Sequence, residues 1–157
     1  MKYFYHIIAL CVFSLLPAYG QYVLSGKVIK VSDGDTFTLE VGSNTRRIRL
    51  SEIDAPENNQ PWGNEATTAL STKVLSQEVQ VMVTGIDQYG RTLGKVFLNE
   101  ININRWLISE GHAWVYQHYS QDETLIVIET KAREANVGLW SLADAIPPWD
   151  WRKGKGN

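Results

Sequence analysis

Three acidic residues and one arginine form the group in the sequence best suited to chemistry: Asp35, Arg49, Asp54 and Glu57. Carboxylate oxygens without histidine or cysteine are the ligands that Ca²⁺ and Mg²⁺ prefer. An arginine beside such a metal suits a phosphate group, because a guanidinium binds two phosphate oxygens at once. Glu57 is then left as a possible base for a water molecule. The group indicates metal-assisted chemistry on a phosphate.

A β-hairpin is expected to bring these residues together. Thr36–Val41 and Thr45–Ile53 both have strand character, and Gly42-Ser43-Asn44 between them is typical of a turn. Such a hairpin returns the chain to the place where it began. Residues that precede the first strand and follow the second should therefore be neighbours.

The expected register of the hairpin places the four side chains at one end. If the turn is centred on its middle residue, Asp35 lies opposite Ser51, and Asp54 emerges at the same end. Arg49 lies two residues back along the returning strand, and at about 3.3 Å per residue its long side chain reaches the acidic end. Glu57 follows after a proline that stiffens the loop.

Each part of this pattern also has a purely structural explanation. Asp33-Gly34-Asp35 is a common turn sequence, and Arg49 alone could be an ion-pair partner on a strand. Asp54–Glu57 alone reads as a loop with acids at a helix start. Asp87–Arg91 alone reads as a hairpin turn with an incidental charge. Only the order and joint geometry of these parts favour an active site.

The rest of the sequence predicts a small antiparallel barrel with helices packed on it, an α+β fold that is mainly β. The further elements expected are strands at 22–31, 78–84, 91–98 and 113–116, and helices at 64–77, 102–110 and 120–136. Asn64 is expected to cap the first helix, and Ser120 and Glu123 are expected to form a capping box for the last. No linker or internal repeat appears, so one domain is expected.

The first twenty residues predict a cleaved signal peptide. Lys2 precedes the apolar run Ile7–Leu16, and Ala18-Tyr19-Gly20 places small residues before a cut at Gln21. An uncleaved anchor or a buried helix is the alternative; a lipoprotein cut before Cys11 is disfavoured because bulky Leu10 precedes it. We therefore expect a secreted or periplasmic protein without stable membrane association after cleavage, whose mature chain has no cysteine.

Composition narrows the class of protein. The chain has 157 residues and is 44% hydrophobic, which is enough for a core, and its 15 basic and 17 acidic residues argue against a broad basic face for nucleic acid. The nucleophile-elbow, phosphate-loop and dinucleotide-binding motifs are all missing. His112 and His118 would be the only histidines after cleavage, which excludes a thiolate–histidine zinc site, and both are expected in surface or packing roles.

Three sequence blocks together resemble the thermonuclease, or staphylococcal nuclease-like, family of the secreted bacterial type. The blocks are Asp33-Gly34-Asp35-Thr36, the run from Arg49 to Glu57, and Tyr89-Gly90-Arg91, and the likeness extends from about Ser25 to Trp140. The resemblance implies a five-stranded oligonucleotide-binding (OB-fold) barrel with about three helices. Residues 21–157 would then be one nuclease domain, with 146–157 a tail rich in tryptophan and proline.

The resemblance also implies roles for particular residues. Asp35 and Asp54 would bind Ca²⁺ through their carboxylates, and Ala55 through its backbone carbonyl. The implied catalytic residues are Arg49 and Arg91, which would stabilise the charge on the scissile phosphate, and Glu57, which would activate water. The implied substrate-binding residues are Tyr89 and Tyr119. Gln88 stands where the family often has a lysine, which predicts weaker phosphate binding.

The implied function is that of an exported, calcium-dependent, sugar-non-specific nuclease. It would cleave DNA and RNA to leave 3′-phosphate ends, and it would act as a monomer. The alternative is a catalytically weak or inactive nuclease-like module that binds nucleic acid or a protein partner. The acidic net charge does not exclude a nuclease, because bound Ca²⁺ would place positive charge where the phosphate must lie.

The tryptophans have two possible roles. Trp106 and Trp140 follow apolar positions and are expected in the core. Trp62, Trp149 and Trp151 could stack on bases, but packing of the loop and tail explains them at least as well.

Overall fold

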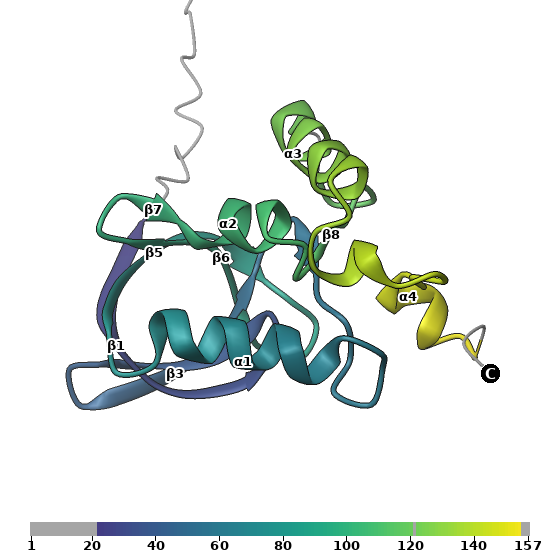
Figure 1. Cartoon of the computed structure of the whole chain (residues 1–157). Coiled ribbons are helices and arrows are strands. Elements are labelled where there is room, and N and C mark those ends of the chain that lie inside the picture. Colours follow the sequence, from purple (N-terminus) through teal and green to yellow (C-terminus); the bar gives the residue numbers. More distant parts are fainter. Residues whose placement is uncertain (1–21, 121, 155–157) are drawn as a thin grey trace, which may run out of the picture.

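The computed structural model describes residues 22–120 and 122–154, and the predicted signal peptide, residues 1–20, lies outside these. The elements in chain order are β1 (Val23–Asp33), β2 (Thr36–Val41), β3 (Asn44–Leu50), β4 (Ile53–Asp54), α1 (Gly63–Val74), β5 (Glu78–Ile86), β6 (Thr92–Leu98), β7 (Ile101–Asn102), α2 (Ile103–Ser109), β8 (Trp114–Val115), α3 (Glu123–Glu134), the 3₁₀ turn η1 (Gly138–Ser141) and α4 (Pro148–Trp151). Figure 1 shows a barrel with the later helices gathered on one side of it.

Five strands close into a barrel, which confirms the predicted fold. They are hydrogen-bonded in the order β3-β2-β1-β5-β6, and a parallel pairing of β3 with β6 closes the ring. Alternation along the strands explains the core: Val79, Val81 and Val83 of β5 point inward, and the residues between them are exposed or half-buried. The barrel interior is filled by side chains such as Phe37 and Ile48, which are fully buried.

The three expected helices are present. Ala66, Leu70 and Val74 of α1 recur at helical spacing and are fully buried against the barrel. Helix α2 begins after Asn102, whose side chain accepts a hydrogen bond from the Arg105 backbone N–H, as a capping residue does. Beyond these helices, η1 and the single turn of α4 lie in a segment that has no periodic sequence pattern.

Two helix starts differ from the predictions. The helix expected from Asn64 begins one residue earlier, at Gly63, after Trp62 in a left-handed conformation with φ of 74°, and no side chain caps it. Helix α3 is capped by Asp122, which accepts from the Thr124 N–H, and the Ser120 hydroxyl accepts from the Asp122 N–H instead of capping the helix. At α3 two good capping residues, Ser120 and Asp122, stand close together, so the sequence pattern does not select one of them; at α1 the N-cap position is Trp62, which capping preferences do not predict.

The predicted strand at 45–53 is interrupted. Strand β3 ends at Leu50, Glu52 adopts a φ of 67°, and β4 leaves the barrel to pair with β8. The interruption turns the chain away from the barrel just before Asp54. Asp54 and Glu57 therefore lie on a segment that runs in a different direction from β3, which carries Arg49.

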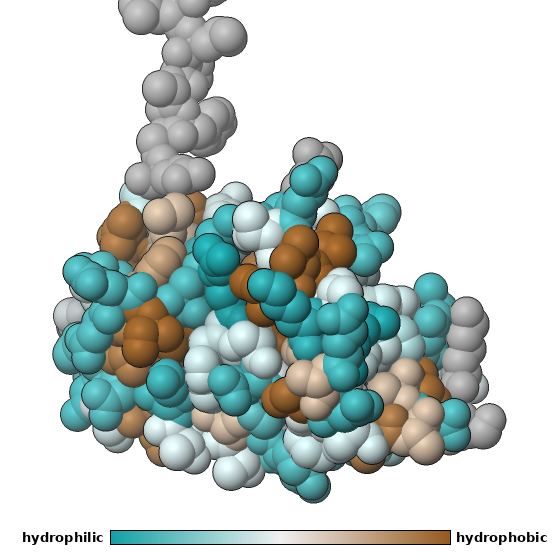
Figure 2. All heavy atoms as spheres, turned by 45° about the horizontal axis from the view of Figure 1, so that its top comes forward, coloured by the Kyte–Doolittle hydropathy of each residue, from teal (hydrophilic) through white to brown (hydrophobic). Residues whose placement is uncertain are grey.

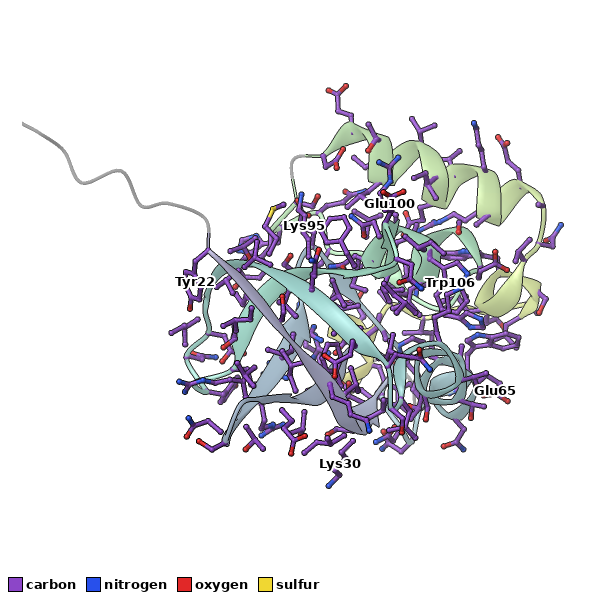
Figure 3. All side chains as sticks on the ribbon, turned by 90° about the vertical axis from the view of Figure 1, so that its left-hand side faces the viewer. Tyr22, Lys30, Glu65, Lys95, Glu100 and Trp106 are labelled. Atoms are coloured by element: carbon purple, nitrogen blue, oxygen red, sulfur yellow. The ribbon has the colours of Figure 1, made fainter. Side chains whose placement is uncertain are left out.

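The surface is polar overall. On the face shown in Figure 2, small hydrophobic patches are separated by hydrophilic side chains. Figure 3 shows Lys30 projecting away from the barrel, whereas Trp106 lies on the side where the helices pack. Among residues 22–120 and 122–154, no helix has the length and apolar character needed to cross a bilayer.

Candidate active site

The hairpin of β2 and β3 brings Asp35 to Arg49, although its register differs from the prediction. Thr36 pairs with Arg49, and the Leu50 N–H donates to the Asp35 carbonyl, so Asp35 lies opposite Leu50 and not Ser51. The turn has two residues between Val41 and its partner Asn44, whereas the prediction assumed three. Despite the one-residue shift, Asp35, Arg49 and Asp54 still meet at the same end of the hairpin.

Arg49 joins the two candidate metal ligands. Its Nη1 forms an ion pair with Asp35 Oδ1, and its Nη2 lies 2.7 Å from Asp54 Oδ1. Both aspartates are almost fully buried, and the Arg49 side chain is only 14% exposed. A guanidinium shared between two carboxylates is therefore the centre of the cluster.

The surroundings shift the pKa values of Asp35 and Asp54 in opposite directions. Burial alone would raise the pKa of Asp35, but the Arg49 guanidinium and the Ala55 N–H, which donates to Asp35 Oδ2 at 2.9 Å, lower it overall. Burial raises the pKa of Asp54 despite its hydrogen bonds to arginine. Burial and the neighbouring Asp35 charge raise the pKa of Asp33 to about 7.

A close backbone approach fixes the turn that carries Asp35. A Cβ on Gly34 would lie 2.7 Å from the Ala55 Cβ and 2.9 Å from the Ala66 Cβ. Only glycine fits between the Asp54–Ala55 segment and α1. Ala55 is buried against this turn, so the metal-site residues of the two segments are packed together.

The loop that carries Glu57 is held by a glutamine that the sequence patterns did not reveal. Gln60 is 6% exposed; its Oε1 accepts from the Glu57 N–H at 3.1 Å, and its Nε2 donates to the Ile146 carbonyl at 2.6 Å. A Cβ on Gly63 would overlap the Glu57 carbonyl oxygen, so a glycine is required there as well. The Glu57 side chain itself is 39% exposed.

Arg91 lies in the turn before β6. Leu93 of β6 pairs with Arg49 in the parallel β3–β6 ladder, so Arg91 stands two residues before the partner of Arg49. Its Nε donates to Asp87 Oδ2 at 2.7 Å, and Asp87 Oδ1 accepts from the backbone N–H groups of Tyr89 and Arg91. The turn thus holds Arg91 by purely local contacts.

The two candidate substrate tyrosines lie on different segments. Tyr89 is 74% exposed in the β5–β6 turn, where its ring lies 5.6 Å from the Arg91 guanidinium. Tyr119 is 68% exposed and packs edge-on against Tyr116 at 4.9 Å. Tyr89 therefore accompanies a predicted catalytic residue, whereas Tyr119 belongs to an aromatic group near the tail.

A second arginine enters the cluster from the C-terminal tail, and the sequence analysis missed it. Arg152 Nη1 lies 2.6 Å from Glu57 Oε1, and its Nη2 lies 2.7 Å from Asp54 Oδ2. The shortest contacts of Asp54 are thus with Arg49 through Oδ1 and with Arg152 through Oδ2. No local pattern could reveal this contact, because 98 positions separate Arg152 from Asp54.

The tryptophans and histidines have packing roles. Trp149 stacks on Tyr116, and Trp151 donates a hydrogen bond to Asn59, so both hold the tail. Trp62 packs against the core and donates to His112 Nδ1 at 3.1 Å. His118 is exposed beside Tyr119. Trp106 also packs against the core, as expected.

The cluster contains the type of donor atom that a hard cation prefers, but guanidiniums bind those donors in this structure. Within the part of the chain that the structure describes, no three His, Cys, Asp or Glu residues are grouped so that they could hold a metal ion. Arg49 and Arg152 bind the carboxylates instead. Asp35, Asp54 and Glu57 nevertheless outnumber the two guanidiniums by one negative charge, and carboxylate oxygens are ligands that Ca²⁺ prefers.

Comparison with known proteins identifies the family. The family model "Staphylococcal nuclease homologue" matches residues 47–142, a range that includes Arg49, Asp54, Glu57 and Arg91. An Escherichia coli O157:H7 protein called "Uncharacterized endonuclease" is 41% identical over 133 residues, covering 84% of this chain and 87% of its own. A Shigella flexneri protein named "Micrococcal nuclease" is 38% identical over 153 residues, covering 90% of this chain and 87% of its own.

Fold, site and relatives together define a nuclease built on an oligonucleotide-binding barrel. The chain belongs to the staphylococcal nuclease family, as its sequence blocks suggested, and it is an endonuclease whose substrates are nucleic acids.

Proposed function

We propose that the protein is an exported, calcium-dependent nuclease that hydrolyses both DNA and RNA and leaves 3′-phosphate ends. The observation that carries the proposal is the convergence of Asp35, Arg49, Asp54 and Glu57 on one point, from three separate segments of the chain. Such a set holds a cation, binds a phosphate and offers a base.

Asp35, Asp54 and the carbonyl of Ala55 would hold the metal. When bound, Ca²⁺ polarises the phosphoryl group and offsets its charge. The burial of both aspartates suits this role, because a cation is attracted more strongly in a site that water does not screen.

Arg49 and Arg91 would bind the scissile phosphate from two strands. Arg49 is almost buried and held by two carboxylates, so its guanidinium is positioned before the substrate arrives. Arg91 is held by Asp87 at the end of the neighbouring strand. Cations fixed in this way stabilise negative charge as it grows in the transition state, without reorganising.

Glu57 would accept the proton of the attacking water. It is the most exposed of the three carboxylates, and Arg152 binds only its Oε1, whereas Asp35 and Asp54 are buried and bound by Arg49. Exposure lets a water molecule reach its oxygens, as a general base requires. Tyr89 and Tyr119 are exposed and would contact the nucleic acid.

The metal roles can be tested by Ca²⁺ titration calorimetry on the wild type and on Asp54→Asn. The substitution removes one ligand charge and should weaken Ca²⁺ binding by at least about tenfold, with a parallel rise in the Ca²⁺ concentration needed for cleavage. End-group analysis should show phosphate at the 3′ ends. Unchanged Ca²⁺ binding in Asp54→Asn would contradict the proposed ligand.

Export is the remaining part of the proposal. It is supported by the predicted signal peptide, with Gln21 as the expected first residue of the mature protein. N-terminal sequencing of protein recovered outside the cytoplasm should begin at Gln21. An intact Met1 start on the exported protein would contradict cleavage.

A further inference from the structure

The C-terminal tail delivers a guanidinium to the two carboxylates with different proposed tasks. Arg152 Nη1 donates to Glu57 Oε1 at 2.6 Å and lies 3.3 Å from Asp54 Oδ1, and its Nη2 donates to Asp54 Oδ2 at 2.7 Å. One planar group thus connects a proposed metal ligand with the proposed base. Arg152 follows the region that the family model matches, which ends at residue 142.

The tail that carries Arg152 is braced against the body of the protein. Trp149 stacks on Tyr116 with 5.3 Å between ring centroids and an interplanar angle of 9°, and it meets Trp114 edge-on at 5.9 Å. Pro148 is buried. These contacts lie within four residues of Arg152, so its backbone position is determined by packing.

Two hydrogen bonds connect the tail to the loop that carries Glu57. Gln60 Nε2 donates to the Ile146 carbonyl at 2.6 Å, and Trp151 Nε1 donates to Asn59 Oδ1 at 3.4 Å. The tail and the 57–60 loop are therefore joined by two hydrogen bonds besides the Arg152–Glu57 contact. An arrangement of this kind sets the distance between the arginine and the carboxylate.

Glu57 needs such a partner more than the buried aspartates do. Its side chain is 39% exposed, whereas that of Asp54 is 1% exposed and already held by Arg49. An exposed carboxylate on a loop has several rotamers, and each rotamer moves its oxygens relative to the water that it must activate. Displacement of a reacting group by about 1 Å can cost about a hundredfold in rate.

We propose that Arg152 is a positioning residue, which the C-terminal tail supplies to hold Glu57 and Asp54 in their working orientation during phosphodiester hydrolysis. This inference rests on the proposed function of Glu57. It concerns a residue that acts through the carboxylates and does not itself react. The planar fork of arginine suits the task, because it binds both acids at once.

The test compares Arg152→Ala, Arg152→Lys and Lys153→Ala in the full chain, with DNA cleavage measured at saturating Ca²⁺. Lys153 is the matched control, since it carries the same charge one residue away and its side chain is 66% exposed. Arg152→Ala should lower kcat by about tenfold or more with KM within about twofold. Lys153→Ala should keep the wild-type kcat, and Arg152→Lys should fall between the two, because an ammonium lacks the fork.

Two further readouts separate positioning from substrate binding or general stability. In a Glu57→Gln background, Arg152→Ala should cause a smaller loss of kcat than in the wild type, because only the contact with Asp54 is then left to remove. Binding of a single-stranded DNA oligonucleotide in chelator, measured by fluorescence anisotropy, should change by less than about threefold. Urea unfolding checks that each variant is folded; if Arg152→Ala does not fold, Arg152→Lys gives the decisive kcat.

Several outcomes would overturn the inference. An unchanged kcat in Arg152→Ala would show that the contact does not contribute to catalysis. A higher kcat in this variant would show that the tail inhibits the enzyme by binding its carboxylates. Fully additive losses in the Glu57→Gln background, or a large loss of oligonucleotide affinity, would assign Arg152 to the substrate. If the wild type itself cleaves nothing with Ca²⁺, the proposed function fails and the inference fails with it. If the wild type cleaves but Arg152→Ala does not behave as expected, only the inference about Arg152 fails.

Discussion

Arg49 and Arg91 have the same proposed task, yet the molecule holds them in opposite ways. Arg49 is bound by two buried aspartates from separate segments, and its side chain is 14% exposed. Arg91 is bound by Asp87, four residues earlier in the same turn, and both side chains are in part exposed. One arginine belongs to the tertiary structure, and the other belongs to a local turn.

Because of this difference, we expect the two arginines to contribute unequally to stability. Removing the shared partner of two buried carboxylates leaves uncompensated charges in the interior, which is costly, whereas a partly exposed ion pair within one turn contributes less. Replacing Arg49 should therefore affect folding and activity together, and replacing Arg91 should affect activity almost alone.

Arg49→Ala should lower the free energy of unfolding by about 3 kcal/mol in metal-free buffer, because it leaves Asp35 and Asp54 facing each other without their shared cation. Urea denaturation measures the change. Arg47→Ala on the same strand, where the side chain is exposed, is the matched control and should stay within about 0.5 kcal/mol of the wild type. Equal effects of the two substitutions would contradict the buried role of Arg49.

Asn104→Ala tests the buried side of the comparison without touching an acid. Asn104 is 2% exposed; its Nδ2 donates to the Ser51 carbonyl at 2.8 Å, and its Oδ1 accepts from the Val96 N–H at 2.9 Å. Because it joins the chain after β3 to β6, its loss should cost about 2 kcal/mol in urea denaturation.

The control for Asn104 is Asn102→Ala, which removes only the cap of α2 and should cost about 1 kcal/mol. A smaller loss for Asn104→Ala than for Asn102→Ala would show that the buried bridge is unimportant.

Arg91→Ala should reduce cleavage by about a hundredfold while changing the free energy of unfolding by less than about 1 kcal/mol. Asp87→Asn separates the turn from the ion pair. Its remaining oxygen can still accept from the Tyr89 and Arg91 N–H groups, but it no longer carries the charge that faces Arg91 Nε. Cleavage by Asp87→Asn should lie between those of the wild type and Arg91→Ala; a loss of folding in Arg91→Ala would remove the distinction between the two arginines.

His112 should give a small dependence of stability on pH, far from both arginines. Burial lowers its pKa, although the Glu110 charge opposes the shift, and its Nδ1 must be unprotonated to accept from Trp62. As pH falls below about 6.5 the unfolded chain takes up this proton first. Stability is therefore present above that pH and is lost as pH falls through the folded-state pKa.

Thermal unfolding of the wild type and His112→Gln at pH 7.5 and 5.5 measures the effect. The drop between the two pH values should be smaller in the variant, because the lost histidine no longer takes up a proton. An equal drop would assign the pH dependence to other groups.

The local parts of the site could be predicted from the sequence. The hairpin, the Asp33–Asp35 turn and the Asp87–Arg91 turn depend on neighbouring residues, so short-range patterns reveal them. The register was wrong by one residue because Gly42, Ser43 and Asn44 are all good turn formers. Their composition does not say whether two or three of them form the loop.

The long-range parts could not be predicted in this way. Gln60 reaches Ile146 across 86 positions, and Arg152 reaches Glu57 across 95. Neither residue lies in a periodic segment, and both contacts depend on how the tail packs on Trp114 and Tyr116. It is therefore easier to find the candidate reacting residues from sequence patterns than to find the residues that hold them in place.

The decisive measurement is the cleavage of DNA and RNA by the purified wild type with Ca²⁺, with Mg²⁺ and with chelator, with Glu57→Gln measured in parallel. We expect that Ca²⁺ supports cleavage of both nucleic acids, that chelator abolishes it, and that Glu57→Gln loses about a hundredfold or more in kcat while remaining folded. Cleavage that continues at the same rate in chelator, or an unimpaired Glu57→Gln, would contradict a calcium-dependent nuclease with Glu57 as its base.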